Sequence, residues 1–548
     1  MKQYIRTLIL SGVVLAGFTA CTDLNTEIDS LYTKYPPNPI ALQAKLEGCY
    51  YYLRSEAGLG RNYWEGVMLQ GDELMGICYK GGYYDNGRLL FPSIHNLKSD
   101  TPGVGLMSDL KSGISYSNRV ILEIGGADGK DEVVAPIRAA RAFYTFLMMD
   151  MYGDVPLLDH APSTDEVIDR APRADVAKWI EKELKEVIPQ LTSDNNIDTY
   201  GRPNKWMAEA LLAKLYLNWG VYTSSDVKTV TNNTPNEKLN DLVAVCDDII
   251  NSKVFEVGKG YRKKFLPDNG VQIKDFIYAM QFDPETYGST YSGGHELDRF
   301  CTFKKANSST PGPWGFAPSQ SCAGVYVLVP ECAARFSLVG DERNEMILKG
   351  PQYAFDYTKK YAITTTPLMF QGQQITYTDI KDAEFYDKST IDVGEDSKYE
   401  NLVKGYRLAK YPSNPDVYNN YKRKNGNDIP IFRYADILLT KAEAILRGAT
   451  ATNGDTPASL INQVRDCSSA PHINGTPSLQ DILDERGREF ICEMWRRNDL
   501  IRFGQFENDW GFKNEINPKA KTELWRRLMP IPKGEMDTNT NWEQNEGY

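Results

Sequence analysis

The sequence predicts a mainly α-helical protein built from packed pairs of helices, with long irregular loops covering one face. Three observations support this prediction. Residues 137–158 carry apolar side chains at helical spacing and around most of the remaining circumference, which indicates a helix buried by other helices. Amphipathic segments recur before residue 252 and after residue 430. Between them helical periodicity fades and Gly, Pro, Ser and Tyr accumulate, which is typical of functional loops.

The N-terminus has the pattern of an export signal. Two basic residues precede the apolar run Leu8–Phe18, which is too short to span a bilayer comfortably. A small residue stands directly before Cys21, so the segment resembles a lipobox, although Phe18 occupies the position where leucine is usual. We expect a signal peptide at 1–20, lipid on Cys21 and a lipidated tether at 21–37. An ordinary secretory signal followed by a chance cysteine is the alternative.

Helices are expected along the N-terminal half of the body. Residues 40–54 and 106–124 have helical patterns, whereas 56–103 is rich in Gly and Tyr, which suggests exposed loops. The buried helix at 137–151 should end at Gly153, which suits a helix C-cap, just before a proline. A membrane span competes with this interpretation, but two arginines interrupt the apolar run.

Three amphipathic helices follow, at 173–191, 205–219 and 239–250. Alanines at positions 208, 210 and 213 let a partner helix approach the second of them closely. Antiparallel helix pairs with small residues at their contacts are the unit of tetratricopeptide (TPR) stacking. The spacing holds no clean period of 34 residues, so we predict TPR-like helical pairs without a regular array.

Helical patterns return at 432–448, 458–466 and 478–503. The last of these segments alternates acidic and basic residues along its length. We interpret these charges as an ion-pair lattice that ties helices together, in preference to a catalytic role. The residues concerned are Glu485, Arg486, Arg488, Glu489, Arg496, Arg497, Asp499 and Arg502.

No pattern of catalytic or metal-binding residues is present in the sequence. It contains no H-E-x-x-H, G-x-S-x-G, P-loop or strand-preceded G-x-G-x-x-G, and its four histidines are isolated. We predict no enzymatic activity, no metal and no cofactor. The net charge of −11 repels phosphates and argues against nucleic acid as a ligand. Cys322 and Cys332 could close a short disulfide loop, and buried free thiols are the alternative.

Several motifs resemble the SusD/RagB family of outer-membrane nutrient-binding lipoproteins from Bacteroidetes. They occur in family order along the chain, although Glu546 stands where family members often have proline in Q-N-P-G-Y. The motifs are Y-G-D-V-P-L (152–157), R-x-A-D-x-L-L-x-x-A-E-A (433–444), I-N-x-V-R (461–465), E-R-x-R-E-F (485–490), W-x-x-x-D-L-I-R-F-G (495–504) and L-M-P-I-P (528–532).

The resemblance implies a SusD-like domain over 38–548. TPR-like helices would occupy about 38–252 and 430–504, and a loop-rich insertion at about 253–428 would carry the ligand face. It also implies a lipid-anchored protein exposed on the outer membrane. Such a protein captures an oligosaccharide or polysaccharide and delivers it to a SusC-like TonB-dependent transporter, without chemistry of its own. Alternatives are a RagB-like peptide-binding lipoprotein, a TPR-like scaffold with only protein partners, and, least favoured, a glycoside hydrolase with two facing carboxylates.

Two loop regions, 61–88 and 282–316, have the composition of a sugar site. Flat aromatic side chains cover the apolar faces of sugars, and polar side chains bind the hydroxyls. The resemblance places glycan-binding loops in these parts of the chain but carries over no single residue by motif. For each aromatic, packing within its own loop is the alternative. The candidates are Trp64, Asp72, Tyr83, Tyr84, Arg88, Tyr287, Tyr291, Asp298, Arg299 and Trp314.

Overall fold

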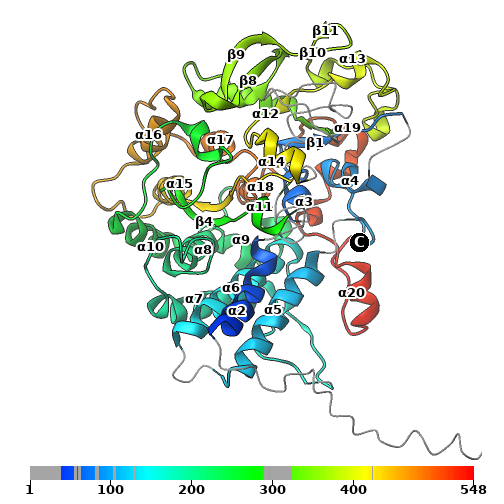
Figure 1. Cartoon of the computed structure of the whole chain (residues 1–548). Coiled ribbons are helices and arrows are strands. Elements are labelled where there is room, and N and C mark those ends of the chain that lie inside the picture. The colour runs from blue at the N-terminus through cyan, green and yellow to red at the C-terminus, as the bar shows by residue number, and fades with distance from the viewer. Residues whose placement is uncertain are drawn as a thin grey trace, which may run out of the picture. The chain divides into compact units, whose positions relative to one another are not determined.

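A computed structural model describes most of the chain (Figure 1). The described residues are 39–54, 59, 63–80, 85–102, 106–126, 131–163, 165–288, 295, 324–421 and 424–548. Contacts divide the chain into a short unit, Met1–Glu47, and a large unit, Gly48–Tyr548. Helix α2 (Pro39–Arg54) is the first described element. The predicted signal peptide (1–20), Cys21 and the tether (21–37) lie outside the described residues.

The buried helix predicted at 137–151 is confirmed as α6 (Asp131–Tyr152). It packs between α5 (Leu106–Glu123) and α7 (Arg173–Val187). Close approach to α5 requires a glycine, because a Cβ on Gly113 would lie 2.5 Å from the ring of Tyr144. Gly153 follows the helix with φ +78°, a left-handed conformation that suits glycine. Among the described residues, no helix has both the length and the apolar character needed to cross a membrane.

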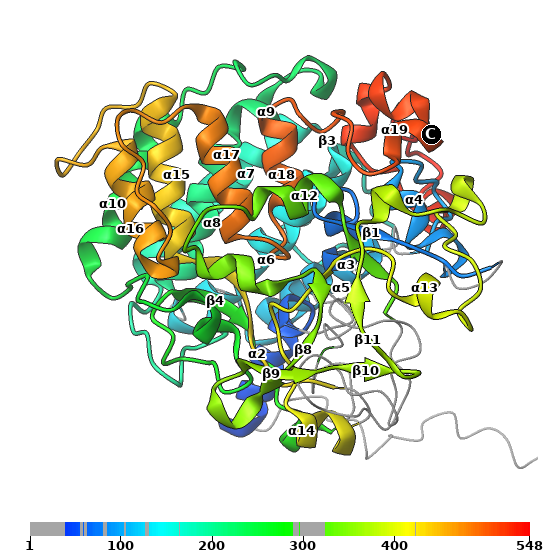
Figure 2. The ribbon, with the colours of Figure 1, turned by 90° about the horizontal axis from the view of Figure 1, so that it is seen from above.

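The predicted amphipathic helices pack side by side as one array (Figures 1 and 2). In that array α7 contacts α8, α8 contacts α10, α10 contacts α15, and α15 contacts both α16 and α17. Helices from before and after the long middle region therefore share a core. The bounds are α8 (Lys205–Leu217), α10 (Leu239–Ser252), α15 (Tyr434–Leu446), α16 (Pro457–Ser468) and α17 (Leu479–Glu489).

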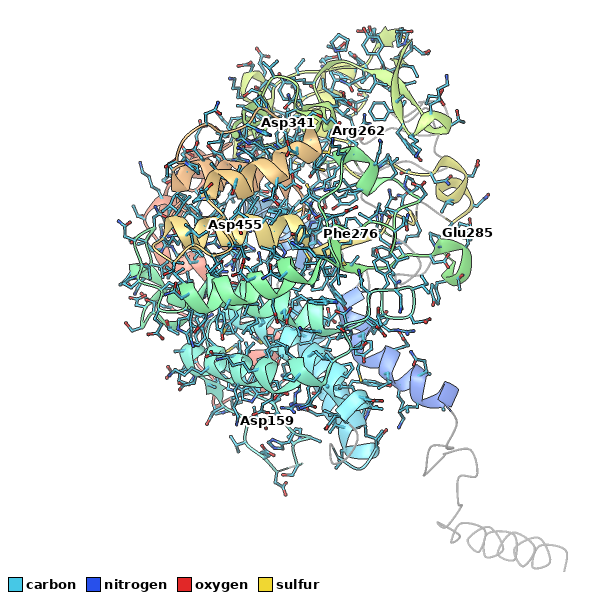
Figure 3. The ribbon with its side chains drawn as sticks, turned by 90° about the vertical axis from the view of Figure 1, so that its left-hand side faces the viewer. Asp159, Arg262, Phe276, Glu285, Asp341 and Asp455 are labelled. Atoms are coloured by element: carbon cyan, nitrogen blue, oxygen red, sulfur yellow. The ribbon has the colours of Figure 1, made fainter. Side chains whose placement is uncertain are left out.

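The strands form small two-stranded antiparallel sheets. The largest, β4 (Phe276–Met280) with β14 (Ile429–Arg433), is fully buried and leads directly into α15; Phe276 is labelled in Figure 3. The other pairs are β1 (Leu74–Gly76) with β5 (Tyr326–Leu328), β2 (Val155–Pro156) with β3 (Arg170–Ala171), β6 (Ile347–Leu348) with β13 (Arg407–Leu408), β7 (Gly350–Pro351) with β12 (Thr376–Tyr377), β8 (Tyr353–Asp356) with β9 (Ala362–Pro367), and β10 (Met369–Phe370) with β11 (Gln373–Gln374).

Short helices connect these elements. They are α3 (Trp64–Met68), α4 (Leu90–Ser93), α9 (Trp219–Thr223), α11 (Pro284–Tyr287), α12 (Pro330–Arg335), α13 (Tyr399–Leu402), α14 (Pro415–Asn420), α18 (Arg496–Arg502), α19 (Lys513–Ile516) and α20 (Lys533–Thr538). Cys332 in α12 is a buried free thiol, so the disulfide considered for Cys322 and Cys332 is not formed.

Two expectations from the sequence are wrong. The described part of 56–103 is mostly buried instead of exposed, because β1 pairs with β5 from far along the chain. The single helix expected at 478–503 is broken into α17 and α18. Cys492 and Met494 adopt left-handed conformations at the break, with φ 57° and 39°. The turn brings the Glu493 carboxylate to Arg433 at 2.8 Å and to Lys410 at 2.5 Å, both buried.

The predicted ion-pair lattice is confirmed and lies in the interior. Arg433, which is 1% exposed, contacts Asp275 at 2.6 Å and Glu489 at 2.8 Å, in addition to Glu493. Arg486 joins Asp436 on α15 to Asp499 on α18, each at 2.7 Å. Arg502 contacts Glu443 on α15 at 2.8 Å. The lattice therefore links α15, α17, α18 and the β4–β14 sheet.

A buried carboxyl group beside this sheet makes stability depend on pH. The Asp428 side chain is buried just before β14 and accepts a hydrogen bond from the backbone N–H of Phe282 at 2.9 Å. Burial raises the pKa of Asp428 to about 7, although this hydrogen bond lowers it. A folded-state pKa above the unfolded value favours the protonated form. The stability that the buried, protonated Asp428 side chain contributes is therefore fully present below a pH of about 4 and is lost as the pH rises toward 7.

We expect Asp428→Asn to stabilise the protein at pH 8 by roughly 1–4 kcal/mol, because the amide stays neutral and its oxygen can still accept from Phe282. The advantage should disappear near pH 4, where wild-type Asp428 is protonated as well. Thermal melts of both proteins across this pH range check the prediction. A difference in Tm that is the same at both ends would contradict it.

Candidate functional site

An open groove of about 890 Å³ lies in the loop-rich region, between β12 and α13. Backbone hydrogen bonds hold its walls. The N–H of Thr378 donates to the carbonyl of Val403 at 3.1 Å, and the N–H of Tyr386 donates to the carbonyl of Asp392 at 2.8 Å. The groove is therefore shaped by main-chain contacts between residues 25 and 6 positions apart in the sequence, not by side chains alone.

Aromatic rings line the groove at two depths. Tyr386 stands at its rim and is 63% exposed, with Lys80 Nζ 5.7 Å from its ring centroid. Tyr399 is half-buried, and its hydroxyl donates to the carbonyl of Gln374 at 2.6 Å while accepting from the N–H of Thr376 at 3.1 Å. The rim therefore presents a flat ring to solvent, the geometry that stacking on a sugar face requires.

The polar lining is mostly acidic. Four carboxylates line the groove, whereas only two ammonium groups do, those of Lys398 and Lys404. Lys404 Nζ donates to the carbonyl of Glu384 at 2.6 Å and to Asn401 Oδ1 at 3.0 Å, and burial lowers its pKa. Carboxylates accept hydrogen bonds from hydroxyl groups and repel anions, so the lining suits a neutral polyhydroxyl ligand. The carboxylates belong to Asp379, Asp382, Glu384 and Glu400.

One of the two predicted sugar-binding segments reaches the edge of this groove. Lys80 Nζ contacts Glu395 at 2.5 Å, and the backbone N–H of Lys80 donates to Asp392 Oδ1 at 2.8 Å. Cys78, two residues before Lys80, also contacts this wall, because it forms a β-bridge with Asp392. Segment 78–80 and the groove wall at 391–395 therefore lie together, although more than 300 residues separate them in sequence.

Of the predicted glycan-binding residues, Trp64, Asp72 and Arg88 lie in the described part of that segment. Trp64 is 1% exposed and packs edge-on against Tyr411 at 5.9 Å. Asp72 is buried; although burial raises its pKa, the guanidinium groups of Arg335 and Arg496, each at 2.6 Å, hold it well below the usual range. Trp64 and Asp72 thus belong to the interior packing.

Arg88 and Tyr287 lie nearer to solvent. Arg88 Nε donates to Glu65 Oε2 at 3.1 Å and is half-buried. Tyr287 is the last residue of α11 and is 58% exposed. The other predicted residues lie outside the described part of the chain, and their roles stay predictions. They are Tyr83, Tyr84, Tyr291, Asp298, Arg299 and Trp314.

Sequence reasoning missed the groove residues Tyr386, Tyr399 and Lys404. The same signal that selected the other loops was present, because D-A-E-F-Y-D-K at 382–388 combines aromatic and charged residues between irregular segments. Its neighbour Lys80, however, comes from a different part of the chain. Only folding brings that residue to the groove.

Comparisons with known proteins agree with this architecture. Residues 368–548 match the sequence model of the SusD family, and residues 108–217 match a model described as starch-binding associating with outer membrane. The chain belongs to the SusD family. The two matched segments together span more than half of it.

Two SusD relatives show how far the similarity extends. The starch-binding protein SusD of Bacteroides thetaiotaomicron is 25% identical over 439 residues, which cover 76% of this chain and 72% of that protein. SusD-like protein P2 of Formosa agariphila is 24% identical over the full length of both proteins.

Solved SusD-like structures share the fold. The surface glycan-binding protein A from Bacteroides thetaiotaomicron, solved in complex with laminarihexaose, superposes with a TM-score of 0.67 at 18% identity; the match covers 92% of this chain and 99% of that one. A laminarin binding SusD-like protein gives the same TM-score at 19% identity, covering 93% of this chain and 100% of that one. The predicted mainly helical SusD-like fold is confirmed. SusD-family glycan-binding proteins are non-catalytic, so the prediction that this chain is not an enzyme is confirmed and the glycoside hydrolase alternative is excluded.

Proposed function

We propose that this SusD-family protein is anchored to the outer membrane through lipid on Cys21, captures an oligosaccharide at the cell surface and delivers it to a SusC-like TonB-dependent transporter. The groove between β12 and α13 is the part of the described structure that we assign to the glycan. Tyr386 would stack on the apolar face of a sugar ring, and the surrounding carboxylates would accept hydrogen bonds from its hydroxyls.

The observation that carries this proposal is the match over most of the chain to proteins whose names record glycan binding. Starch and laminarin are the ligands named for these relatives, so both belong in a first binding screen. A neutral glucan also suits the acidic groove better than an anionic polysaccharide does, because like charges would repel it.

Two alternatives remain distinct from this proposal. A RagB-like peptide-binding protein would retain peptides in the same screen and release glycans. A TPR-like scaffold would retain neither and would co-purify only with proteins. Purification from native membranes in mild detergent, followed by identification of a co-isolated barrel, separates a transporter partner from a free-standing binder.

We expect Tyr386→Ala to weaken glycan binding at least about 10-fold. The loss of an aromatic platform costs roughly 1–3 kcal/mol by analogy with base stacking, and 1.4 kcal/mol is a factor of ten. Calorimetric titration with the glycan found in the screen measures this effect. Tyr353→Ala is the matched control, because Tyr353 is 38% exposed on β8 and does not line the groove.

Affinity that is unchanged in Tyr386→Ala but lost in Trp314→Ala would move the site to the predicted loop at 282–316. A wild-type protein that retains no glycan or peptide would overturn the proposed function itself.

A further inference from the structure

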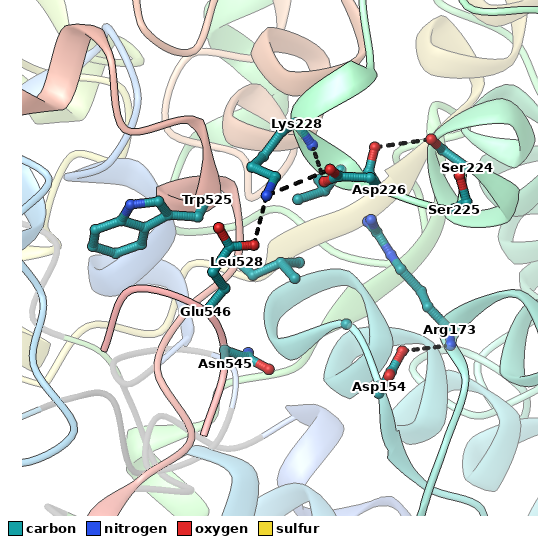
Figure 4. A pocket seen from close by; sticks show the side chains of 12 residues that line it. Asp154, Arg173, Ser224, Ser225, Asp226, Lys228, Trp525, Leu528, Asn545 and Glu546 are labelled. Carbon is teal, nitrogen blue, oxygen red and sulfur yellow. Dashed lines mark hydrogen bonds and ion pairs between the residues drawn. The ribbon is translucent and has the colours of Figure 1, made fainter. Parts of the chain in front are cut away.

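A second, smaller pocket lies where the start of α7, the turn after α9 and the C-terminal segment meet (Figure 4). Its volume is about 200 Å³. The C-terminal wall is held in place by Asn545, whose Nδ2 donates to the carbonyls of Tyr152 and Met529, each at 2.8 Å. Arg170 donates to Asn545 Oδ1 at 2.6 Å. The pocket is therefore a built feature of the fold and not a gap between loose loops.

Arg173 extends into this pocket (Figure 4) and is 8% exposed. Its guanidinium lies over the ring of Tyr222 at 4.9 Å. Its Nε is enclosed and has no hydrogen-bond acceptor, and within the described residues its guanidinium forms no ion pair with a carboxylate. Burial lowers the pKa of this guanidinium, although Tyr222 and Asp150 raise it. A buried charge without an acceptor is costly and rare in a folded protein.

Three other buried arginines, Arg343, Arg433 and Arg486, have the carboxylate partners that Arg173 lacks. Arg343 contacts Asp341 at 2.7 Å, Glu485 at 2.8 Å and Glu489 at 3.0 Å. Arg433 and Arg486 likewise each contact two or more carboxylates. A guanidinium has five N–H donors in a planar fork that matches a carboxylate. Arg173 instead lines the pocket, and within the described residues its terminal N–H groups form no hydrogen bond or ion pair with a carboxylate, so they are the donors that a ligand could use.

The carboxylates that line the pocket are already used elsewhere. Asp226 and Glu546 both contact Lys228 Nζ, at 3.5 and 2.6 Å. Asp154 Oδ1 accepts from the backbone N–H of Arg173 at 2.8 Å. The Glu546 and Lys228 side chains are 66% and 33% exposed, so this ion pair contributes little and can open at small cost. Displacing Glu546 would free Lys228 for a ligand.

We propose that this pocket binds the carboxylate group of a small molecule, which would accept hydrogen bonds from Arg173 and replace Glu546 at Lys228. The three acidic side chains disfavour a ligand with two or more negative charges, which selects a monoanion. At about 30 Å³ per water, the pocket has room for roughly six or seven waters. A short organic acid fits this space, and so does one acidic sugar residue. The site is separate from the groove assigned to the glycan.

The probes are sodium acetate for a free organic acid and sodium glucuronate for an acidic sugar, with sodium chloride at equal ionic strength as the baseline. Calorimetric titration and thermal melts of the purified full-length protein measure binding. We expect a dissociation constant on the order of 1 mM or weaker for acetate, because so small a ligand has few contacts to make. If acetate binds and glucuronate does not, the ligand is a free organic acid. If glucuronate binds more tightly than acetate, the ligand is an acidic sugar.

Two variants test the assignment in opposite directions. Arg173→Gln should weaken binding at least 10-fold, since it removes the charged fork. Glu546→Gln should tighten binding several-fold, because it removes the carboxylate that competes for Lys228. Arg119→Gln, the same charge change on an exposed side chain of α5, is the matched control and should leave binding unchanged.

The proposal is overturned if neither acid binds to the wild-type protein or to the Glu546→Gln variant. If Arg173→Gln does not fold, the Glu546→Gln variant still decides, because its exposed side chain can change without disturbing the core. Equal or weaker binding in that variant counts against the pocket. Glycan retention is measured with different ligands at a different site, so either proposal can fail alone.

Discussion

Arg433→Met should lower the free energy of unfolding by about 3–5 kcal/mol, the cost of breaking a buried ion pair from one side. Arg433 contacts three buried carboxylates, those of Asp275, Glu489 and Glu493. Methionine fills much of the volume of the arginine stem. The loss of stability is therefore due more to the uncompensated charge of the carboxylates than to a cavity. Because Arg433 joins β14 to the turn between α17 and α18, the change should loosen both elements.

Chemical denaturation and thermal melts measure this effect. Arg119→Met is the control, because Arg119 is 61% exposed and its ion pair with Glu123 is long, at 3.8 Å; a change within about 0.5 kcal/mol is expected there. Adding Glu489→Gln to Arg433→Met should recover part of the stability, since it removes one of the carboxylates that lost Arg433, while Arg343, the other partner of Glu489, keeps Asp341 and Glu485. Wild-type stability in Arg433→Met would mean that the lattice does not hold these elements together.

Cys21→Ala should remove the protein from the outer-membrane fraction almost completely. The proposed anchor is the diacylglyceryl group on this residue, and two acyl chains bind a bilayer stably where one chain binds only marginally. The preceding apolar run is too short to replace the anchor by spanning the bilayer comfortably. We expect the variant either as a free exported protein or as a precursor that retains its signal, and in both cases without fatty-acid label.

Fractionation of cells grown with labelled fatty acid separates these outcomes. Thr22→Ala is the neighbouring control and should keep both the label and the membrane location. Recovery of Cys21→Ala in the outer-membrane fraction at the wild-type level would reject lipid anchoring at this residue. That result would leave the glycan groove untouched, because binding is measured on purified protein.

Local patterns in the sequence predicted the helices well. The segments at 173–191, 205–219, 239–250 and 432–448 appear within a few residues of those bounds as α7, α8, α10 and α15. Each carries its apolar residues at a spacing that only a helix places on one face, so the information is contained in the segment itself. The motifs that resemble the SusD family are equally local, which is why family and fold could be predicted together.

The candidate sites depended on contacts that no local pattern reports. Trp64 and Asp72 have residue types suited to sugar binding, yet one packs on Tyr411 and the other on Arg335 and Arg496. Composition describes what a side chain can bind, whereas burial decides what it does bind. Tyr386 was overlooked for the same reason, since its exposure and the nearby Lys80 are products of folding.

By itself the sequence determined the helical class, the family, the absence of a recognisable catalytic motif and the position of the expected lipid anchor, because periodicity, motif order and composition are properties of neighbouring residues. The tertiary structure alone decided the break between α17 and α18, the burial of the segment after α2 and the pocket around Arg173. Glu493 contacts Arg433 and Lys410 because an unpaired buried charge is costly, and those partners lie 60 and 83 residues away along the chain. Long-range pairing of this kind is set by the packed core, where the cost of an unpaired charge exceeds any local helix preference.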